Sequence, residues 1–382
     1  MKIAIDLTST QKNKTGIGRY MLGILIGLQK IDRENDYYLF TQDDDLDGFG
    51  IYAPNFHIVP VKSSIMRKTY IRILWEQIVL PFRVRKIGAD VLHCPNYTMP
   101  YLSRFIDRKL AVVSTFHDMA YFLHPEYLIG WKRMMFCGYI RQTARNCDKI
   151  VAVSHNTAKD SLACIKPRNK DIEVTYLGAD DAFFDTPAAT DDILAKYKIP
   201  GKYILYVGTL EPRKNVAGLI RGYRELPDEI KKEYKLVITG KKGWYYDEIF
   251  STVGSDPSLK ENVIFTGFVD DEDMIPLMKR ASEVGYVSFF EGFGLPVLEA
   301  MASGVPIVTT SGSSLSEVAG DCGYLCDPSD PKSIADALRR GLGDSEGKVG
   351  KALERARTFT WKRCGEHTLK AYKDALKFRR GQ

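Results

Sequence analysis

Short β-rich runs alternate with helix-like segments along the chain, and this alternation begins twice. In the helix-like segments, apolar residues recur at intervals of three and four, as Ile17, Met21, Ile24 and Leu28 do. Strands that alternate with helices form right-handed crossovers, which place the strands in one parallel sheet. In the first half we predict strands at 2–7, 37–41, 57–61, 91–94, 111–116 and 149–154, and helices at 16–28, 65–85 (broken near Pro81) and 130–146.

The second half repeats the pattern, with predicted strands at 203–208, 235–239, 263–265, 283–289 and 306–309 and helices at 216–225, 274–281 and 296–303. A chain of 382 residues is long enough for two domains at ~150 residues each. We therefore predict an α/β protein with an N-terminal domain at 1–184 and a C-terminal domain at 185–360. A basic helix at 361–382 follows, and we expect it to return to the N-terminal domain.

Composition excludes several classes of protein. Hydrophobic residues make up 45% and charged residues 27%, which is typical of globular domains and not of disordered or collagen-like chains. No apolar run approaches the ~20 residues that span a bilayer, and a strand lies where the apolar region of a signal peptide would be, so we expect no secretory signal. Scattered thiols are typical of a cytoplasmic protein, and the seven cysteines are Cys94, Cys137, Cys147, Cys164, Cys322, Cys326 and Cys364.

The net charge of +6 is small for this length, and no basic stripe with interleaved aromatic residues stands out. We therefore expect no nucleic-acid partner.

The first motif with chemical content is Gly208-Thr209-Leu210-Glu211-Pro212-Arg213-Lys214-Asn215, directly after a predicted strand. Open α/β sheets bind ligands at strand ends of this kind. Arg213 offers a planar fork to phosphate oxygens and Lys214 a point charge. A solvated basic turn is the alternative.

The most specific motif is Glu291-Gly292-Phe293-Gly294-Leu295-Pro296-Val297-Leu298-Glu299. A glycine-rich loop that opens into a helix leaves N–H groups for a phosphate. Glu291 and Glu299 lie on either side of this anion site. Two carboxylates would both repel a phosphate, but each can accept hydrogen bonds from sugar hydroxyls. The alternative is that Glu291 caps the loop and Glu299 is solvated. A weaker motif is Thr15-Gly16-Ile17-Gly18-Arg19, in which glycines would let the backbone approach a phosphate. The dinucleotide fingerprint needs a third glycine where Met21 stands, so a simple glycine-rich turn at the start of a helix is the alternative.

Together these segments resemble the retaining glycosyltransferases of family 4, in order along nearly the whole chain. Ser316-Glu317-Val318-Ala319-Gly320-Asp321 and Cys326-Asp327-Pro328 resemble the family's next segment. The resemblance implies the GT-B architecture, in which two Rossmann-like domains face each other across a deep cleft. It implies transfer of a hexose from a nucleotide sugar to a glycan or lipid-linked acceptor.

The resemblance also assigns roles. Arg213 and Lys214 would neutralise the donor diphosphate, Glu299 would bind the ribose and Glu291 the donor sugar. His117, at a strand end, matches the family's histidine near the transferred sugar, and the alternative for it is a core histidine. The catalytic residues implied are His117, Glu291, Arg213 and Lys214. The donor-binding residues implied are Gly16, Gly18, Gly208, Arg213, Lys214, Glu291, Gly292, Phe293, Gly294, Leu295, Val297 and Glu299, with backbone N–H groups of Gly294, Leu295 and Val297 among the contacts.

The family is thought to use front-face attack, with the leaving phosphate taking the acceptor's proton, and fixed cations at that phosphate are the largest expected catalytic effect. No metal or other cofactor is then needed. We read Asp43-Asp44-Asp45 as a solvated loop and Cys322 with Cys326 as core thiols. The Glu-Pro-Arg-Lys-Asn segment at 211–215 and the Phe-His-Asp segment at 116–118 resemble those of subgroups that use GDP-mannose. This resemblance favours mannose transfer in polysaccharide synthesis. A nucleotide-sugar epimerase and a non-catalytic nucleotide-sugar-binding subunit are the alternatives.

Two basic segments interleave apolar and cationic residues, at 62–86 and 131–145. Basic amphipathic helices bind anionic membrane surfaces, which predicts a peripheral protein at the inner face of the plasma membrane. Ordinary helices that pack their apolar face on the domain are the alternative.

Overall fold

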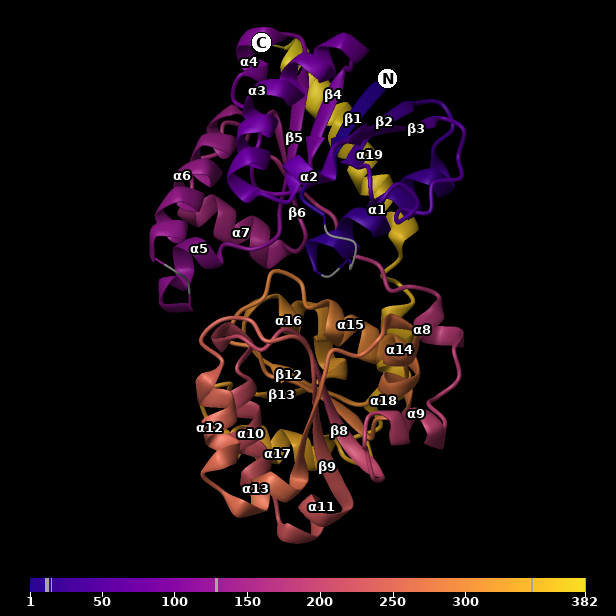
Figure 1. Cartoon of the computed structure of the whole chain (residues 1–382), viewed down its shortest axis with the longest axis vertical. Helices are drawn as coiled ribbons and strands as arrows, with labels where there is room; N and C mark the ends of the chain where they lie inside the picture. Colours follow the sequence, from indigo (N-terminus) through magenta and orange to yellow (C-terminus); the bar gives the residue numbers. More distant parts are fainter. Residues whose placement is uncertain (11–13, 15, 128–129, 345, 382) are drawn as a thin grey trace. The chain divides into compact units, whose positions relative to one another are not determined.

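The computed structural model describes residues 1–10, 14, 16–127, 130–344 and 346–381, so Thr15 lies outside the described residues. The chain divides into two compact units, Met1–Gly178 with Thr360–Gln382, and Ala179–Phe359 (Figure 1). Each unit is an α/β domain around its own parallel sheet.

The first unit contains a seven-stranded sheet, within the described residues, in the order β3-β2-β1-β4-β5-β6-β7. All its strand pairs are parallel, as the alternation of strands and helices predicts. The strands are β1 Lys2–Asp6, β2 Asp36–Gln42, β3 Phe56–Val61, β4 Val91–Cys94, β5 Ala111–Phe116, β6 Lys149–Ala152 and β7 Ile172–Val174. The helices are α1 Ile17–Ile31, α2 Ser63–Met66, α3 Thr69–Ile87, α4 Ser103–Ile106, α5 Ala120–Leu123, α6 Gly130–Asn146, α7 His155–Cys164 and α19 Trp361–Arg380.

The second unit repeats the plan with the strand order β10-β9-β8-β11-β12-β13. Its strands are β8 Lys202–Val207, β9 Tyr234–Thr239, β10 Val263–Gly267, β11 Glu283–Tyr286, β12 Ile307–Thr310 and β13 Tyr324–Cys326. Its helices are α8 Ala182–Asp185, α9 Asp191–Lys196, α10 Val216–Arg224, α11 Asp228–Glu233, α12 Asp247–Gly254, α13 Pro257–Asn262, α14 Asp271–Arg280, α15 Leu295–Ala302, α16 Ser313–Ala319, α17 Pro331–Gly341 and α18 Lys348–Ala356.

Both sheets reverse their strand order beside the first strand, at β1/β4 and at β8/β11. The order 3-2-1-4-5-6 is that of the doubly wound nucleotide-binding fold, and such sheets bind ligands outside the carboxyl ends of the strands at this switch point. The loops after β8 and β11 therefore occupy the favoured position for a ligand in the second unit. These are the loops that carry Arg213, Lys214 and Glu291.

Helix α19 packs along α1 in the first unit (Figure 1). The contact is close because glycines line it: a Cβ on Gly27 would lie 2.0 Å from the Trp361 carbonyl oxygen. Side chains add polar links, since His93 Nδ1 lies 2.8 Å from the Tyr372 hydroxyl and His367 Nδ1 lies 2.7 Å from Glu173. The C-terminal helix thus completes the core of the first unit.

Two expectations need correction. Helix α3 runs through Pro81 without a break, and the interruption lies earlier, where Lys68 is extended. Proline costs a helix about 3 kcal/mol, but Leu80 and Val84 on either side are fully buried and offset that cost. The boundary after residue 184 lies too late, because Lys279 of the second unit donates to the carbonyls of Phe183 and Phe184 at 3.1 and 2.8 Å.

Candidate active site

The loop after β8 turns sharply to bring two cations to the sheet edge. Gly208 has φ 156°, and a Cβ there would lie 2.8 Å from the Tyr206 hydroxyl, so a side chain would strain this turn. The chain then forms a short 3-10 turn, Pro212–Lys214, which ends at Asn215 with φ 54°. Asn215 fixes the turn by donating to the carbonyls of Val287 and Pro328 at 3.1 and 2.8 Å.

The strand β11 ends earlier than predicted, at Tyr286 instead of residue 289. Beyond it the chain bonds to the β8 loop: the Phe289 N–H donates to the Arg213 carbonyl at 3.0 Å, and the Ser288 hydroxyl oxygen lies 2.9 Å from the same carbonyl oxygen. Two loops that are far apart in sequence are thereby joined at the switch point. The Ser314 hydroxyl adds a bond of 2.8 Å to the Glu291 carbonyl.

Glu291 is the centre of the site. One carboxylate oxygen, Oε1, accepts hydrogen bonds from Lys214 Nζ at 2.5 Å, Ser288 Oγ at 2.9 Å and the Tyr286 hydroxyl at 3.0 Å. The other, Oε2, accepts from Arg213 Nη1 at 2.9 Å. The predicted residues Arg213, Lys214 and Glu291 therefore meet in one cluster.

The cluster is nearly neutral and largely shielded from water. Arg213 also donates to Glu211 Oε1 at 2.9 Å and to the Phe290 carbonyl at 2.7 Å, so two cations face two carboxylates. Only 8% of Glu291 is exposed. Burial alone would raise the pKa of Glu291, but the charges of Arg213 and Lys214 and their hydrogen bonds outweigh it and lower the pKa to about 2. Glu291 is thus ionised at neutral pH.

Lys214 has one donor to spare. An ammonium group carries three N–H bonds, and Lys214 uses two of them, for Tyr286 at 2.7 Å and for Glu291. The third has no acceptor among the residues that the structure describes. An anion beside Lys214 can therefore bind without breaking the cluster.

The glycine-rich loop after Glu291 opens into α15. Gly294, at φ 99°, begins the helix, and a Cβ there would lie 2.4 Å from Leu315. Pro296 lies in the first turn, where its missing N–H costs little. The Val297 N–H donates to the Gly294 carbonyl at 3.0 Å inside the turn, and the backbone contacts of Gly294, Leu295 and Val297 with a donor stay a prediction.

Of the other predicted residues of this motif, Glu299 lies on α15, and Gly292 and Phe293 lie in the loop before it. Glu299 is buried on the helix, about one turn after its first residue, Leu295. Phe293 is buried against Phe359 with ring centroids 6.1 Å apart. Gly292 lies between Glu291 and Phe293 at the sheet edge.

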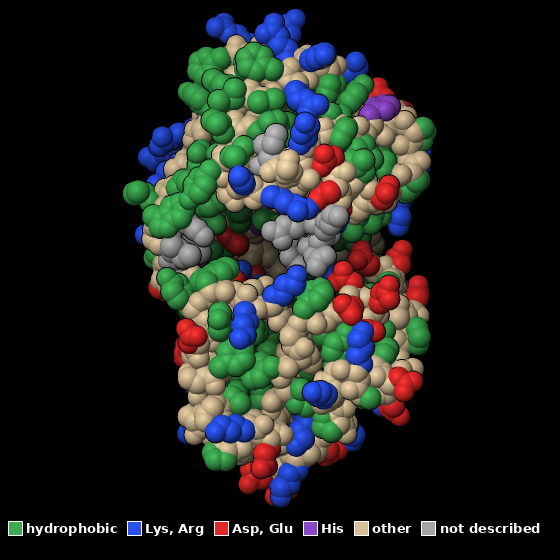
Figure 2. All heavy atoms as spheres, viewed as in Figure 1, with side chains coloured by type: hydrophobic (Ala, Val, Ile, Leu, Met, Phe, Trp, Pro, Cys, Tyr) green, Lys and Arg blue, Asp and Glu red, His purple; other side chains and the backbone are tan. Residues whose placement is uncertain are grey.

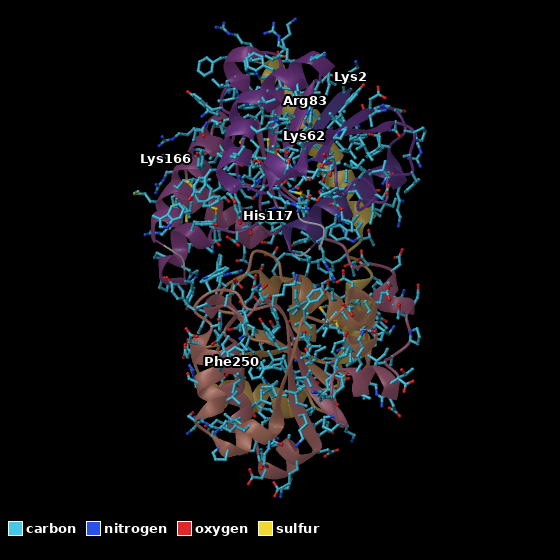
Figure 3. The ribbon with its side chains drawn as sticks, in the orientation of Figure 1. Lys2, Lys62, Arg83, His117, Lys166 and Phe250 are labelled. Carbon is cyan, nitrogen blue, oxygen red and sulfur yellow. The ribbon has the colours of Figure 1, made fainter. Side chains whose placement is uncertain are left out.

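His117 directly follows β5, at the carboxyl edge of the first unit's sheet (Figure 3). Its Nε2 lies 2.9 Å from the Pro95 carbonyl, which can only accept, so Nε2 carries the proton and Nδ1 has a lone pair. Burial lowers the pKa of His117, although the Pro95 bond and Asp118 oppose it. The imidazole is therefore neutral, fixed in one tautomer and able to accept a hydrogen bond.

Gly16 and Gly18 lie at the start of α1, which begins at Ile17 after Gly16 with φ 49°. The acidic stretch nearby is a loop in which Asp43 and Asp47 are exposed, and three of its acids also make ion pairs or hydrogen bonds. Asp45 binds Lys14 Nζ at 3.0 and 2.9 Å, Asp44 pairs with Arg67, and Asp43 accepts the Ser63 N–H at 2.9 Å. Among the described residues, no group of three or more His, Cys, Asp or Glu is placed to hold a metal ion.

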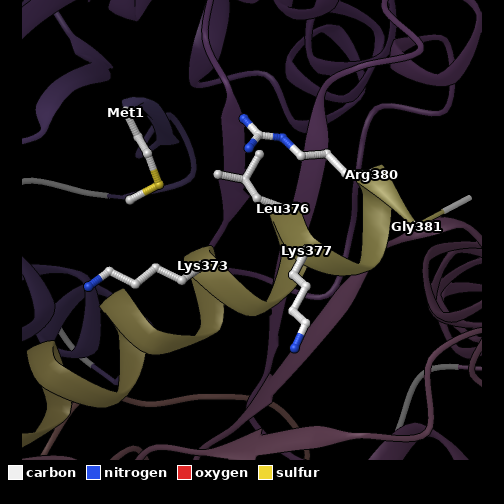
Figure 4. Close-up of a pocket in the computed structure, with 6 residues that line it drawn as sticks. All are labelled: Met1, Lys373, Leu376, Lys377, Arg380 and Gly381. Atoms are coloured by element: carbon white, nitrogen blue, oxygen red, sulfur yellow. The ribbon is translucent and has the colours of Figure 1, made fainter.

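Sequence reasoning missed Tyr286, Ser288 and Ser314, which bond to Glu291. It also missed that Glu211 binds Arg213 and that Asn215 fixes the turn after β8. Glu211 and Asn215 stand inside the quoted motif, and their places beside Arg213 and Lys214 were a usable signal. A separate pocket of about 500 Å³, lined by Met1, Lys373, Leu376, Lys377, Arg380 and Gly381, lies beside α19 and contains none of the predicted site residues (Figure 4).

A family model described as "Glycosyl transferases group 1" matches residues 190–358, and one described as "Glycosyltransferase Family 4" matches residues 14–183. O-antigen chain mannosyltransferase B of Escherichia coli is 33% identical over 98% of this chain and 100% of its own length. O-antigen chain mannosyltransferase RfbU of Salmonella typhimurium is 27% identical over 88% of this chain and 89% of its own.

Among solved structures, sucrose-phosphate synthase from Thermosynechococcus elongatus is similar with a TM-score of 0.76 and 18% identity, over 97% of this chain and 98% of that one. At 18% identity, this similarity is evidence for the fold alone. With the two parallel sheets, it identifies the fold as GT-B.

Proposed function

Because the chain belongs to glycosyltransferase family 4 and is a hexosyltransferase, we propose that it transfers mannose from GDP-mannose to a glycan in O-antigen synthesis, with retention of configuration and without a metal ion. The family decides against the epimerase and the non-catalytic subunit as alternatives. The observation that carries the proposal is the Arg213–Glu291–Lys214 cluster at the switch point of the second unit. The mannosyl assignment rests on the O-antigen mannosyltransferases that the chain resembles over 98% and 88% of its length.

Transfer of the sugar requires that the negative charge on the leaving diphosphate be stabilised. As the bond between the anomeric carbon and the phosphate oxygen breaks, the diphosphate gains negative charge and the sugar gains positive charge. Fixed cations at the leaving group stabilise this state without reorganising. The spare N–H of Lys214 suits a phosphate oxygen, and the Arg213 guanidinium lies beside it.

Glu291 has two tasks in this proposal. It holds Arg213 and Lys214 in fixed positions, and its ionised carboxylate accepts hydrogen bonds from hydroxyls of the donor sugar. Glu299, on α15, accepts from the ribose hydroxyls. The neutral His117 accepts a hydrogen bond at Nδ1 from a hydroxyl near the transferred sugar.

Proton transfer balances the reaction. The acceptor hydroxyl oxygen bonds to the anomeric carbon on the face that the phosphate leaves, and its proton passes to the departing phosphate oxygen. No side chain needs to form a covalent intermediate. We propose that the acceptor is lipid-linked and that the reaction takes place in the cytoplasm.

The test is a donor panel. We expect GDP to raise the melting temperature more than UDP or ADP does, since a ligand of the native state alone stabilises it by mass action. We expect transfer from GDP-mannose to exceed transfer from UDP-glucose, with a product of the donor's anomeric configuration by NMR. A stronger effect of UDP together with transfer from UDP-glucose alone would overturn the mannosyl assignment.

A further inference from the structure

Helix α3 has an apolar stripe on its solvent side. Tyr70, Leu74, Ile78 and Phe82 recur every four residues and are 64%, 58%, 44% and 55% exposed. The opposite side of the helix is also apolar, because Leu80 and Val84 are fully buried. A helix on the surface of a globular protein normally has a polar outer side. The apolar side chains on the outer side of α3 therefore need another explanation than the core.

The stripe continues onto α4. Phe105 of α4 is exposed, as are Tyr101 and Leu102 directly before this helix, and the rings of Tyr101 and Phe105 lie 5.4 Å apart. The Gln77 side chain joins the two helices, since it donates to the Met99 carbonyl and accepts from the Tyr101 N–H, both at 2.9 Å. The two apolar surfaces are thus held together.

Helix α6 extends the surface on the other side. Trp131 and Met134 are 51% and 77% exposed. The Trp131 ring stacks on Tyr70 with a centroid distance of 6.4 Å. We call this surface, made of the exposed apolar residues of α3, α4 and α6, the α3–α4–α6 face. Figure 2 shows hydrophobic side chains gathered over these helices. The side chains of Ile65 and Lys132 lie outside the part of the chain that the structure describes.

Positive charge predominates in the segment that carries most of this face. Residues 63–109 contain nine Lys and Arg and three acids, a surplus of six positive charges that equals the net charge of the whole chain. Each of the three acids has a partner. Glu76 is buried and pairs with Arg72 at 3.0 Å. Asp90 accepts a hydrogen bond from the Lys2 N–H at 2.8 Å, and Asp107 accepts one from the Lys109 N–H at 2.9 Å. The exposed cations are Lys68, Arg85, Lys86, Arg108 and Lys109, together with Arg67, which is paired with Asp44.

We propose that the α3–α4–α6 face docks on a bilayer that contains anionic lipid, with the apolar side chains in the headgroup boundary and the flanking cations on the headgroups. Exposed Trp and Tyr beside Lys and Arg suit this interface, and each cation near an anionic surface adds about 1 kcal/mol. A second copy of the chain is disfavoured, because it would bring two sets of like charges together. No described helix is both long and apolar enough to cross a bilayer.

This inference depends on the proposed function only for the lipid-linked acceptor, and binding can be measured without turnover. The experiment is co-sedimentation of the full chain with phosphatidylcholine vesicles that contain either no phosphatidylglycerol or about a third of it, at low and at raised salt. We expect binding to the anionic vesicles that salt weakens.

Two double variants test the face. Leu74→Ser with Phe82→Ser removes apolar side chains, and Lys68→Glu with Lys86→Glu reverses two charges. We expect each to weaken vesicle binding roughly ten-fold or more. The matched control is Lys373→Glu with Lys377→Glu, which reverses two exposed lysines on α19 of the same unit (Figure 4). We expect it to bind like the unmodified chain.

The outcomes separate the two proposals. Failure to bind anionic vesicles, or an equal loss in the α19 control, overturns the docking inference. So does a dimer in solution that Leu74→Ser with Phe82→Ser converts to a monomer, because the face would then join two copies. Turnover of a water-soluble acceptor, unchanged in both face variants, shows that they are folded. Absence of that turnover in the unmodified chain counts against the proposed function and leaves the vesicle result standing.

Discussion

Lys214 Nζ lies 2.5 Å from Glu291 Oε1, so an ion pair joins the loop after β8 to the loop after β11. The two residues are 77 positions apart in the sequence, and the strand order alone brings their loops together. The pair matters for function because it fixes an ammonium group, with a donor to spare, at the switch point where doubly wound sheets bind ligands.

Replacing Glu291 with Gln tests its two roles together. The change keeps the shape but removes the negative charge, which leaves Arg213 and Lys214 without their shared counter-charge and weakens the acceptor for sugar hydroxyls. We expect kcat to fall about 100-fold or more. Steady-state kinetics with the donor checks this result. Glu248→Gln, an exposed residue paired with Arg221 in the same unit, is the control that keeps full activity. Equal kinetics in both variants would show that Glu291 has no part in the reaction.

His93 makes the first unit sensitive to acid. It is fully buried between the Tyr372 and Thr115 hydroxyls at 2.8 and 2.9 Å, and burial, with a smaller effect of His117, lowers its pKa from 6.5 to about 3. The unfolded chain therefore binds more protons between these values, so stability falls as the pH drops below about 6.5. At pH 4.5 the loss from His93 is about 2–3 kcal/mol. Urea unfolding of His93→Gln and the unmodified chain at pH 7.5 and 4.5 measures it, and an identical pH dependence in both would refute it.

Glu283 makes the second unit less stable at high pH, whereas His93 makes the first unit less stable at low pH. It is fully buried at the start of β11, and neither carboxyl oxygen has a hydrogen-bond partner within the described part of the chain. Burial raises its pKa well above the ordinary value of 4.5, so the folded chain holds a proton that the unfolded chain loses. Stability therefore falls as the pH rises above about 4.5. We expect Glu283→Gln to be more stable than the unmodified chain at pH 8 and similar to it at pH 4.5. Thermal unfolding at both pH values checks this, and a lower melting temperature of the variant at pH 8 would contradict it.

The contact between α1 and α19 has no room for a methyl group at Gly27. A Cβ there would lie 2.0 Å from the Trp361 carbonyl oxygen, which is backbone and cannot turn aside. We expect Gly27→Ala to cost about 1–3 kcal/mol of stability. Gly138→Ala is the matched control, since Gly138 lies in α6 with nothing within 4 Å of an added Cβ. It is expected to be neutral or stabilising by roughly 0.5–1 kcal/mol. Equal melting temperatures for the two variants would show that α19 does not pack tightly.

Periodicity predicts most of the elements because long strands and helices repeat their apolar pattern several times. Helix α6 is predicted to the residue, at 130–146. The strands β7 and β13 are three residues long, too short for any pattern, and they owe their place to neighbouring strands. The continuity of α3 through Pro81 also depends on tertiary burial, which local rules do not contain.

For the site, the motifs predict which residues are involved but not how they pair. Arg213, Lys214 and Glu291 were expected to face a substrate separately, and in the structure they bind one another. That pairing depends on the register of β8 against β11, which no local pattern encodes. Tyr286 and Ser288 were missed for the same reason, since they read as ordinary strand residues.

The central claim is that Arg213 and Lys214 stabilise the departing diphosphate of a mannosyl donor. The most direct test is the rate of mannose transfer from GDP-mannose by Arg213→Ala and by Lys214→Ala, with Lys202→Ala, an exposed lysine paired with Glu233, as the control. The account predicts that each of the first two variants loses about 100-fold or more in kcat, while the control is unchanged. Near-normal turnover in both site variants would contradict it.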